Sequence, residues 1–128
     1  MNNKITLLVS IFLIMLLLIG CKSKEVNASD ILDLVQSNYI SIKINDKTIE
    51  TGSKQQYLID DFIPKLSRYT LKSYQEELPE TYSHRVDITY KDKSTITLLD
   101  NKYLVVNDVN YEILNGKIDL NTFYNFIE

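Results

Sequence analysis

The longest apolar run of the chain lies near its N-terminus, where residues 5–19 carry only two polar side chains, Thr6 and Ser10. A helix of about 15 residues rises roughly 22 Å, which is short of the ~30 Å hydrocarbon core of a bilayer. The single charge of Lys4 precedes the run. A short positive segment followed by an apolar stretch of this length is typical of an export signal. We therefore expect residues 1–20 to be a signal peptide.

The most regular alternation of apolar and polar residues begins at Tyr82 and continues to Leu114. Strict alternation predicts strands with one buried face. The predicted strands span residues 82–90, 94–99, 103–106 and 109–114, and the polar turns between them span residues 91–93, 100–102 and 107–108. Four strands joined by tight polar turns predict an antiparallel meander with one face exposed to solvent.

A shorter alternating segment precedes the meander. Ile40, Ile42 and Ile44 are predicted to share the buried face of one strand. Residues 45–46 supply a turn, so residues 47–50 can return as a second short strand. The pattern therefore predicts an N-terminal strand or hairpin.

The segment before this hairpin carries little pattern. Residues 22–29 are polar and lack periodicity, so we expect residues 21–29 to form a flexible tether. Residues 30–35 are more apolar and are predicted to form one helical turn capped by Ser29 or Asp30.

Two further segments place apolar residues at helical spacing. The first carries Ile59, Phe62, Ile63, Leu66 and Tyr69. Pro64 lies within it, so this helix should kink or restart there. The second follows Asp119, a residue type that caps helix N-termini. Its apolar residues are Leu120, Phe123, Tyr124 and Ile127.

Together these segments predict a small α+β domain over residues 30–128. Its expected architecture is an antiparallel meander of about four strands plus an N-terminal strand or hairpin, packed by a central helix and a C-terminal helix. The chain length of 128 residues also favours one domain.

The charge of the chain limits its partners. The net charge is −3, and since Lys4 is the only charged residue of the expected signal, residues 21–128 carry 13 basic and 17 acidic side chains, a net charge of −4. A mildly acidic domain without a basic cluster lacks the electrostatic footprint of a nucleic-acid-binding protein. It would also be weakly repelled by an anionic leaflet, so its charge does not attach it to a membrane.

The apolar run ends in Leu18-Ile19-Gly20-Cys21, which contains the only cysteine and therefore permits no intramolecular disulfide. This tetrapeptide resembles the lipobox of bacterial lipoproteins. The resemblance covers the first 21 residues and implies that Cys21 receives a diacylglyceryl thioether and that a lipoprotein signal peptidase cuts between Gly20 and Cys21. Two acyl chains give lasting attachment, so we expect a lipid anchor in the cell membrane at the extracytoplasmic face.

An uncleaved signal anchor with an unmodified cysteine is the alternative interpretation of these residues. The remainder of the chain is similar in size and layout to small uncharacterised lipoproteins of low-GC Gram-positive bacteria. That similarity carries over no site residues.

Several polar residues resemble sites but have simpler explanations. His84 is the only histidine and is expected to be a half-buried structural side chain, since no second histidine or spare nucleophile accompanies it. Asp108, Asn110 and Glu112 alternate like ligands of a hard cation, but they lack the pattern of a calcium loop, and strand alternation accounts for the spacing. The adjacent pair at residues 60–61 is expected on the solvated side of a helix. We expect no metal and no cofactor.

Tyrosine is the unusual component of the composition, with nine residues and no tryptophan. Tyrosine side chains favour binding surfaces as well as sheet faces. The less regular stretch from Tyr69 to Tyr82 is the expected place for recognition, because loops on rigid scaffolds carry function. Tyr74 and Tyr82 are the proposed partner surface.

These observations favour a non-enzymatic binding or accessory module whose partner is a peptide or an envelope protein. A specific version is a lantibiotic-immunity lipoprotein, which sequesters a membrane-active peptide outside the cell. The alternative is a cell-envelope hydrolase that uses carboxylates such as Asp87 and Asp92, a mechanism that depends on the distance between two carboxyl groups.

Overall fold

The computed structural model describes residues 3–11, 24–35 and 38–128. Residues 3–11 form a helix whose apolar side chains lie in solvent, with Leu8 66% exposed. Within the described ranges, no helix has both the length and the hydropathy that a membrane span requires.

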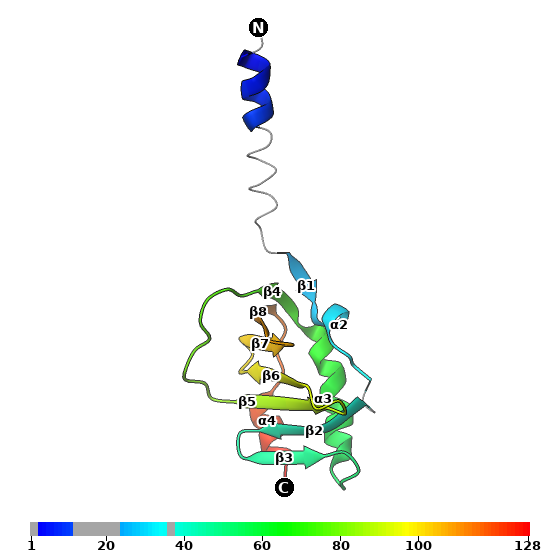
Figure 1. Cartoon of the computed structure of the whole chain (residues 1–128). Coiled ribbons are helices and arrows are strands. Elements are labelled where there is room, and N and C mark those ends of the chain that lie inside the picture. Colours follow the sequence, from blue (N-terminus) through cyan, green and yellow to red (C-terminus); the bar gives the residue numbers. More distant parts are fainter. Residues whose placement is uncertain (1–2, 12–23, 36–37) are drawn as a thin grey trace.

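The described strands form one eight-stranded sheet, and every pairing in it is antiparallel (Figure 1). The strand order is β1-β4-β8-β7-β6-β5-β2-β3. The strands are β1 (Glu25–Asn27), β2 (Tyr39–Ile44), β3 (Lys47–Glu50), β4 (Thr70–Ser73), β5 (Arg85–Tyr90), β6 (Thr95–Leu99), β7 (Tyr103–Val106) and β8 (Val109–Asn115). The helices of this part are α2 (Ala28–Ile31), α3 (Gln56–Lys65), the 3-10 helix η2 (Leu66–Arg68) and α4 (Leu120–Phe126).

The predicted meander is present as β5 to β8, which are consecutive in the chain and adjacent in the sheet. Its last turn consists of Asn107 and Asp108, whose φ angles of 49° and 64° place both residues in the left-handed region. Two such residues make a turn whose twist matches that of the flanking strands. Asn and Asp tolerate this conformation better than other non-glycine residues, so local chemistry fixes the register of this hairpin.

The prediction of about four strands plus a hairpin undercounts the sheet, because it misses β1 and β4. Residues 25–27 pair with β4 in register Val26 to Leu71, and Ala28 is fully buried. The predicted flexible tether is therefore wrong for residues 25–29. Strands of three or four residues are too short for alternation to show, so only pairing with distant partners defines them.

The predicted face of β2 is also partly wrong. Ile42 and Ile44 are buried as expected, but Ile40 is 40% exposed and Tyr39 is buried instead. The pairing of β2 with β5 is irregular between Tyr39 and Ser41. A bulge inserts one extra residue and so exchanges the faces of the residues on one side of it.

Helices α3 and α4 confirm the predicted central and C-terminal helices and pack on one face of the sheet (Figure 1). Pro64 lies in the last turn of α3, and the chain continues as η2, in agreement with the predicted interruption. The Asp119 carboxylate accepts a hydrogen bond from the Thr122 backbone N–H and caps α4 as predicted. The turn expected over residues 30–35 begins earlier, because α2 starts at Ala28 with Asn27 as an N-cap that makes no side-chain bond.

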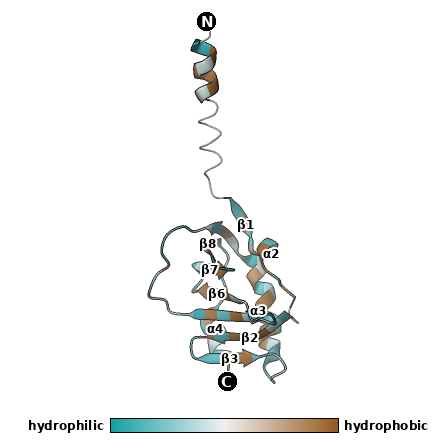
Figure 2. Cartoon of the chain, in the orientation of Figure 1, coloured by the Kyte–Doolittle hydropathy of each residue, from teal (hydrophilic) through white to brown (hydrophobic). Residues whose placement is uncertain are grey.

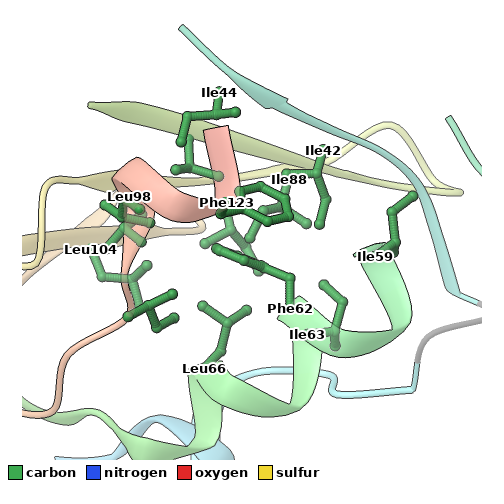
Figure 3. Packing of buried hydrophobic residues seen from close by; sticks show 14 of the residues in the cluster. Ile42, Ile44, Ile59, Phe62, Ile63, Leu66, Ile88, Leu98, Leu104 and Phe123 are labelled. Carbon is green, nitrogen blue, oxygen red and sulfur yellow. The ribbon is translucent and has the colours of Figure 1, made fainter. Parts of the chain in front are cut away.

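The core lies between the helices and the inner face of the sheet (Figure 3). Phe62 of α3 and Phe123 of α4 meet with ring centroids 4.5 Å apart, and Ile42, Ile88 and Leu98 lie on the strands that face them. Apolar and polar residues alternate along the strands, as Figure 2 shows. The other face of the sheet is accordingly more polar.

Gly116, just after β8, offers a test of this packing. It has a φ of +107°, and a Cβ at this position would lie 2.7 Å from the Arg68 carbonyl oxygen. Gly52 has a φ of +87°, but nothing lies within 4 Å of a Cβ there. We expect Gly52→Ala to cost about 1–2 kcal/mol for the left-handed backbone, and Gly116→Ala to cost about 1–3 kcal/mol more for the overpacking. Urea unfolding measures both, and equal losses would contradict the predicted contact with Arg68.

Candidate binding groove

A groove of about 310 Å³ lies between α3 and α4, and its lining residues come from these two helices and from residues 118–119 just before α4. Its apolar residues are Leu58 and Phe62 of α3, Ile118, and Phe123 and Phe126 of α4, together with Tyr57 at the α3 end. The Phe62 and Phe123 rings, which are tilted by 34° with respect to one another, connect the two walls. The groove therefore lies directly over the core that joins the two helices.

Two aromatic side chains project from this groove. Tyr57 and Phe126 are each 61% exposed, whereas Leu58 and Phe123 are buried. Both side chains lie outside the apolar stripe that each helix turns toward the sheet, so core packing does not require an aromatic residue at either position. Exposed aromatic residues beside an apolar groove are typical of interaction sites.

The charged residues of the groove lie on its rim. Asp61 and Lys65 of α3 form an ion pair of 2.8 Å, one helical turn apart. Asp119 lies at the start of the opposite wall, where hydrogen bonds from Thr122 lower the pKa of its carboxyl group, with smaller contributions from Lys117 and then Lys65. The two carboxylates of the rim are therefore opposed by two lysines, Lys65 and Lys117.

The β2–β3 hairpin holds the wall formed by α4. The Tyr124 hydroxyl donates to Asp46 Oδ1 at 2.6 Å and so lowers the pKa of that carboxyl group. Lys47 Nζ donates to the Tyr124 carbonyl oxygen at 3.2 Å and lies 4.2 Å from the Tyr124 ring centroid. The Gln55 side chain bonds the backbone of Phe126 and Glu128. These contacts fix α4 at the β3 edge of the sheet.

The groove has the chemistry of a small apolar binding site, since ligand pockets are mainly apolar with a few polar groups at the margin. The chain matches no family model, no curated protein and no solved structure. Sequence reasoning missed the groove. The only local indication of it was an aromatic residue beside the apolar stripe of each helix, Tyr57 and Phe126. The groove itself forms only when two helices that are distant in the sequence come together.

The proposed partner surface of Tyr74 and Tyr82 consists of two separate places in the structure. The Tyr74 ring packs on Tyr103 with centroids 4.9 Å apart, and a hydrogen bond with Tyr103 raises the pKa of Tyr74 to about 12. Tyr82 is 41% exposed and lines a polar hollow with Arg85 and Asp87. The two tyrosines mark the two ends of the loop from β4 to β5. A shared recognition role for them stays a prediction.

His84 lies at the end of the same loop, and its side chain is half-buried as expected, at 22% exposure. Its Nδ1 atom lies 3.8 Å from Asp100 Oδ1. The Asp100 carboxylate accepts hydrogen bonds from the backbone N–H groups of Ser83 and His84, at 3.2 and 2.9 Å. Asp100 therefore connects the end of the loop to the β6–β7 turn. His84 lies at this connection, in agreement with a structural role.

The carboxylates considered for hydrolysis do not share a site. Asp87 lies on β5, and its carboxylate accepts hydrogen bonds from Arg85 Nε and Thr97 Oγ1. Asp92 lies in the turn after β5, where hydrogen bonds from Ser94 lower the pKa of its carboxyl group. The two residues line different hollows. Asp87 and Asp92 therefore do not face one another across a common hollow, and the hydrolase alternative stays a prediction.

The three residues considered as cation ligands do not all lie on one strand, as their alternation in the sequence suggested. Asp108 belongs to the β7–β8 turn with a φ of 64°, whereas Asn110 and Glu112 lie on β8. Over residues 3–11, 24–35 and 38–128, no three His, Cys, Asp or Glu side chains are grouped to hold a metal ion. Asp60 and Asp61 lie on the exposed side of α3, as predicted. Gly20 and Cys21, the predicted cleavage and lipid-attachment residues, lie outside the described residues.

The cap of α4 predicts an acid-dependent stability. Because the folded pKa of Asp119 lies below its ordinary value of 3.8, its stabilising effect is complete above that pH and is lost as the pH falls through the lowered pKa. We expect Asp119→Ala to lower the urea midpoint at neutral pH, and Asp119→Asn, which retains a cap, to preserve it. Both variants should lose less stability on acidification than the wild type. An unchanged acid dependence in Asp119→Asn would contradict this role of the carboxylate.

Proposed function

We propose that the protein is a membrane-anchored extracytoplasmic lipoprotein whose folded domain is a non-enzymatic binding or accessory module. The observation that carries this proposal is the sequence Leu18-Ile19-Gly20-Cys21 directly after the apolar run of residues 5–19. No other cysteine competes for the modification. The diacylglyceryl group on Cys21 provides the membrane affinity that a domain of net charge −4 lacks.

The exposed apolar helix at residues 3–11 supports an export role for this segment. Leu7 and Leu8 are 62% and 66% exposed, an arrangement that is unfavourable in water and suits a segment that acts in a membrane. Lipoprotein processing would remove it after export.

The start of the folded domain supports a close attachment to the bilayer. β1 begins at Glu25, so four residue steps separate it from the acylated Cys21. Such a linker reaches at most about 14 Å. A module held at this distance acts at high local concentration on other molecules of the cell surface.

The groove between α3 and α4 supports a binding role for the domain. Its apolar lining and the two exposed aromatic side chains provide a contact surface. Binding of a peptide or an envelope protein needs only such a surface. Lantibiotic immunity is one form of this role, and protection of a sensitive strain on expression would support it.

The anchor is tested by metabolic labelling with a radioactive fatty acid. We expect label in the wild-type protein and none in Cys21→Ser, because the thioether requires the thiol. Globomycin, which inhibits the lipoprotein signal peptidase, should make the unprocessed precursor accumulate. Cell fractionation should find the wild-type protein with the membrane.

The matched control for this experiment is Gly20→Ala, which keeps a small residue before the cysteine and should leave labelling intact. Equal labelling and equal maturation of the wild type and Cys21→Ser would contradict the lipoprotein proposal. The wild-type protein could carry the fatty-acid label while its size does not change with globomycin. That result would indicate an acylated but uncleaved anchor and would contradict the cleavage after Gly20.

A further inference from the structure

We propose that Asn115 is a site of spontaneous covalent modification, where the side chain cyclises with the Gly116 backbone to a succinimide that opens to aspartate or isoaspartate. Asn115 and Gly116 form the only asparagine–glycine pair of the chain. They lie at the end of β8, just before the segment that leads to α4. This inference is independent of the proposed function, because water is the only reagent that the reaction consumes.

The structure places the nucleophile of this reaction beside its electrophile. The Gly116 backbone N–H donates a hydrogen bond to Asn115 Oδ1 at 2.9 Å, so the Gly116 nitrogen lies next to the side-chain amide carbon, Asn115 Cγ. Intramolecular reactions are fast when the reacting atoms are held about 3–3.5 Å apart. Gly116 has no Cβ that would shield its nitrogen. The Asn115 side chain is exposed, so water reaches the site.

The atoms of the reaction balance with water alone. The Gly116 amide loses its proton to a base of the solvent, and its nitrogen forms a bond to Asn115 Cγ. The Cγ–Nδ2 bond breaks, and Nδ2 takes up a proton and leaves as ammonia. Water then adds to one of the two ring carbonyl carbons, the bond from this carbon to the nitrogen breaks, and the nitrogen regains a proton. Opening at Cγ gives aspartate, and opening at the main-chain carbonyl carbon gives isoaspartate.

Two other asparagines show how the same side chain is held away from this reaction. Asn101 Oδ1 accepts from the Ile118 backbone N–H at 2.8 Å, and its Nδ2 donates to the Ile118 carbonyl oxygen at 2.9 Å. Asn45 Oδ1 accepts from the Arg85 backbone N–H at 2.9 Å. Each of these amides is fixed by another segment of the chain, and each precedes a residue larger than glycine. They therefore serve as internal references for Asn115.

Isoaspartate would lengthen the main chain where both sides of the site are held. Asn115 pairs with Thr70 of β4, and both backbone groups of Ile118 are bonded to one side chain of the β6–β7 turn. Between them, the Gly116 backbone lies so close to Arg68 that a Cβ would meet its carbonyl oxygen at 2.7 Å. One added backbone carbon must displace one of these contacts, which is unfavourable in a close-packed structure. Aspartate adds a negative charge but leaves the backbone unchanged.

The test incubates the purified full chain in detergent micelles at mildly alkaline pH, with peptide mass spectrometry at intervals. We expect isoaspartate and aspartate at residue 115, with one heavy oxygen atom incorporated when the incubation is made in heavy-oxygen water. The rate should exceed those at Asn45 and Asn101 by about tenfold or more, because small displacements of the reacting atoms slow an intramolecular reaction strongly. A free peptide of residues 112–118 sets the time scale of the incubation.

Asn115→Gln is the matched control, since it keeps an exposed amide but would have to close a larger ring. It should remain unmodified and keep its urea midpoint during the incubation. Asn115→Asp reproduces the charge of the product, so incubated wild-type protein that contains isoaspartate should unfold at lower urea than freshly prepared Asn115→Asp. The difference measures the cost of the longer main chain.

Two results would overturn the proposal. The first is a wild-type chain without isoaspartate at residue 115 when the free peptide has already converted. The second is modification of Asn45 or Asn101 at the same rate as Asn115, which would show that the contact with Gly116 has no effect. Equal urea midpoints of incubated wild type and fresh Asn115→Asp would contradict the predicted strain at Gly116.

Discussion

The structure depends on the burial of the inner face of the sheet by two helices that come from different parts of the chain. Phe62 of α3 and Phe123 of α4 meet over this face with ring centroids 4.5 Å apart (Figure 3). Neither helix is long enough to be stable alone in water, and the sheet cannot leave its apolar face exposed. Each layer therefore exists because the other covers it, and this mutual burial is the main favourable term.

The same packing produces the groove. Two helices that converge on a shared aromatic contact leave a channel on their outer side, and the residues beside the buried stripe line it. Contacts from the β2–β3 hairpin to Tyr124 hold α4 in place. The β2–β3 turn thus joins two strands of the sheet and also positions one wall of the groove. Within the described residues, this is where apolar surface and exposed aromatic side chains coincide.

Several carboxylate residues have structural tasks at the ends of regular elements. Asp100 holds the end of the β4–β5 loop, Asp108 turns the last hairpin, and Asp119 caps α4. Asp100 and Asp119 accept hydrogen bonds from backbone N–H groups, and Asp108 adopts the left-handed conformation that its turn requires. The sequence predicted the cap and the turn correctly, because both depend on interactions within a few residues. It did not indicate the groove, which is formed by residues about 60 positions apart in the chain.

The sequence by itself determined the meander of β5 to β8 and the two helices, because alternation, helical spacing and turn chemistry are local properties. Only the tertiary structure decided the pairing of β1 with β4, the burial of Tyr39 in place of Ile40, and the meeting of Tyr57 with Phe126 at one groove. The physical reason is the range of the interactions. Short strands, bulges and grooves are defined by partners distant in the chain, and no local pattern records those partners.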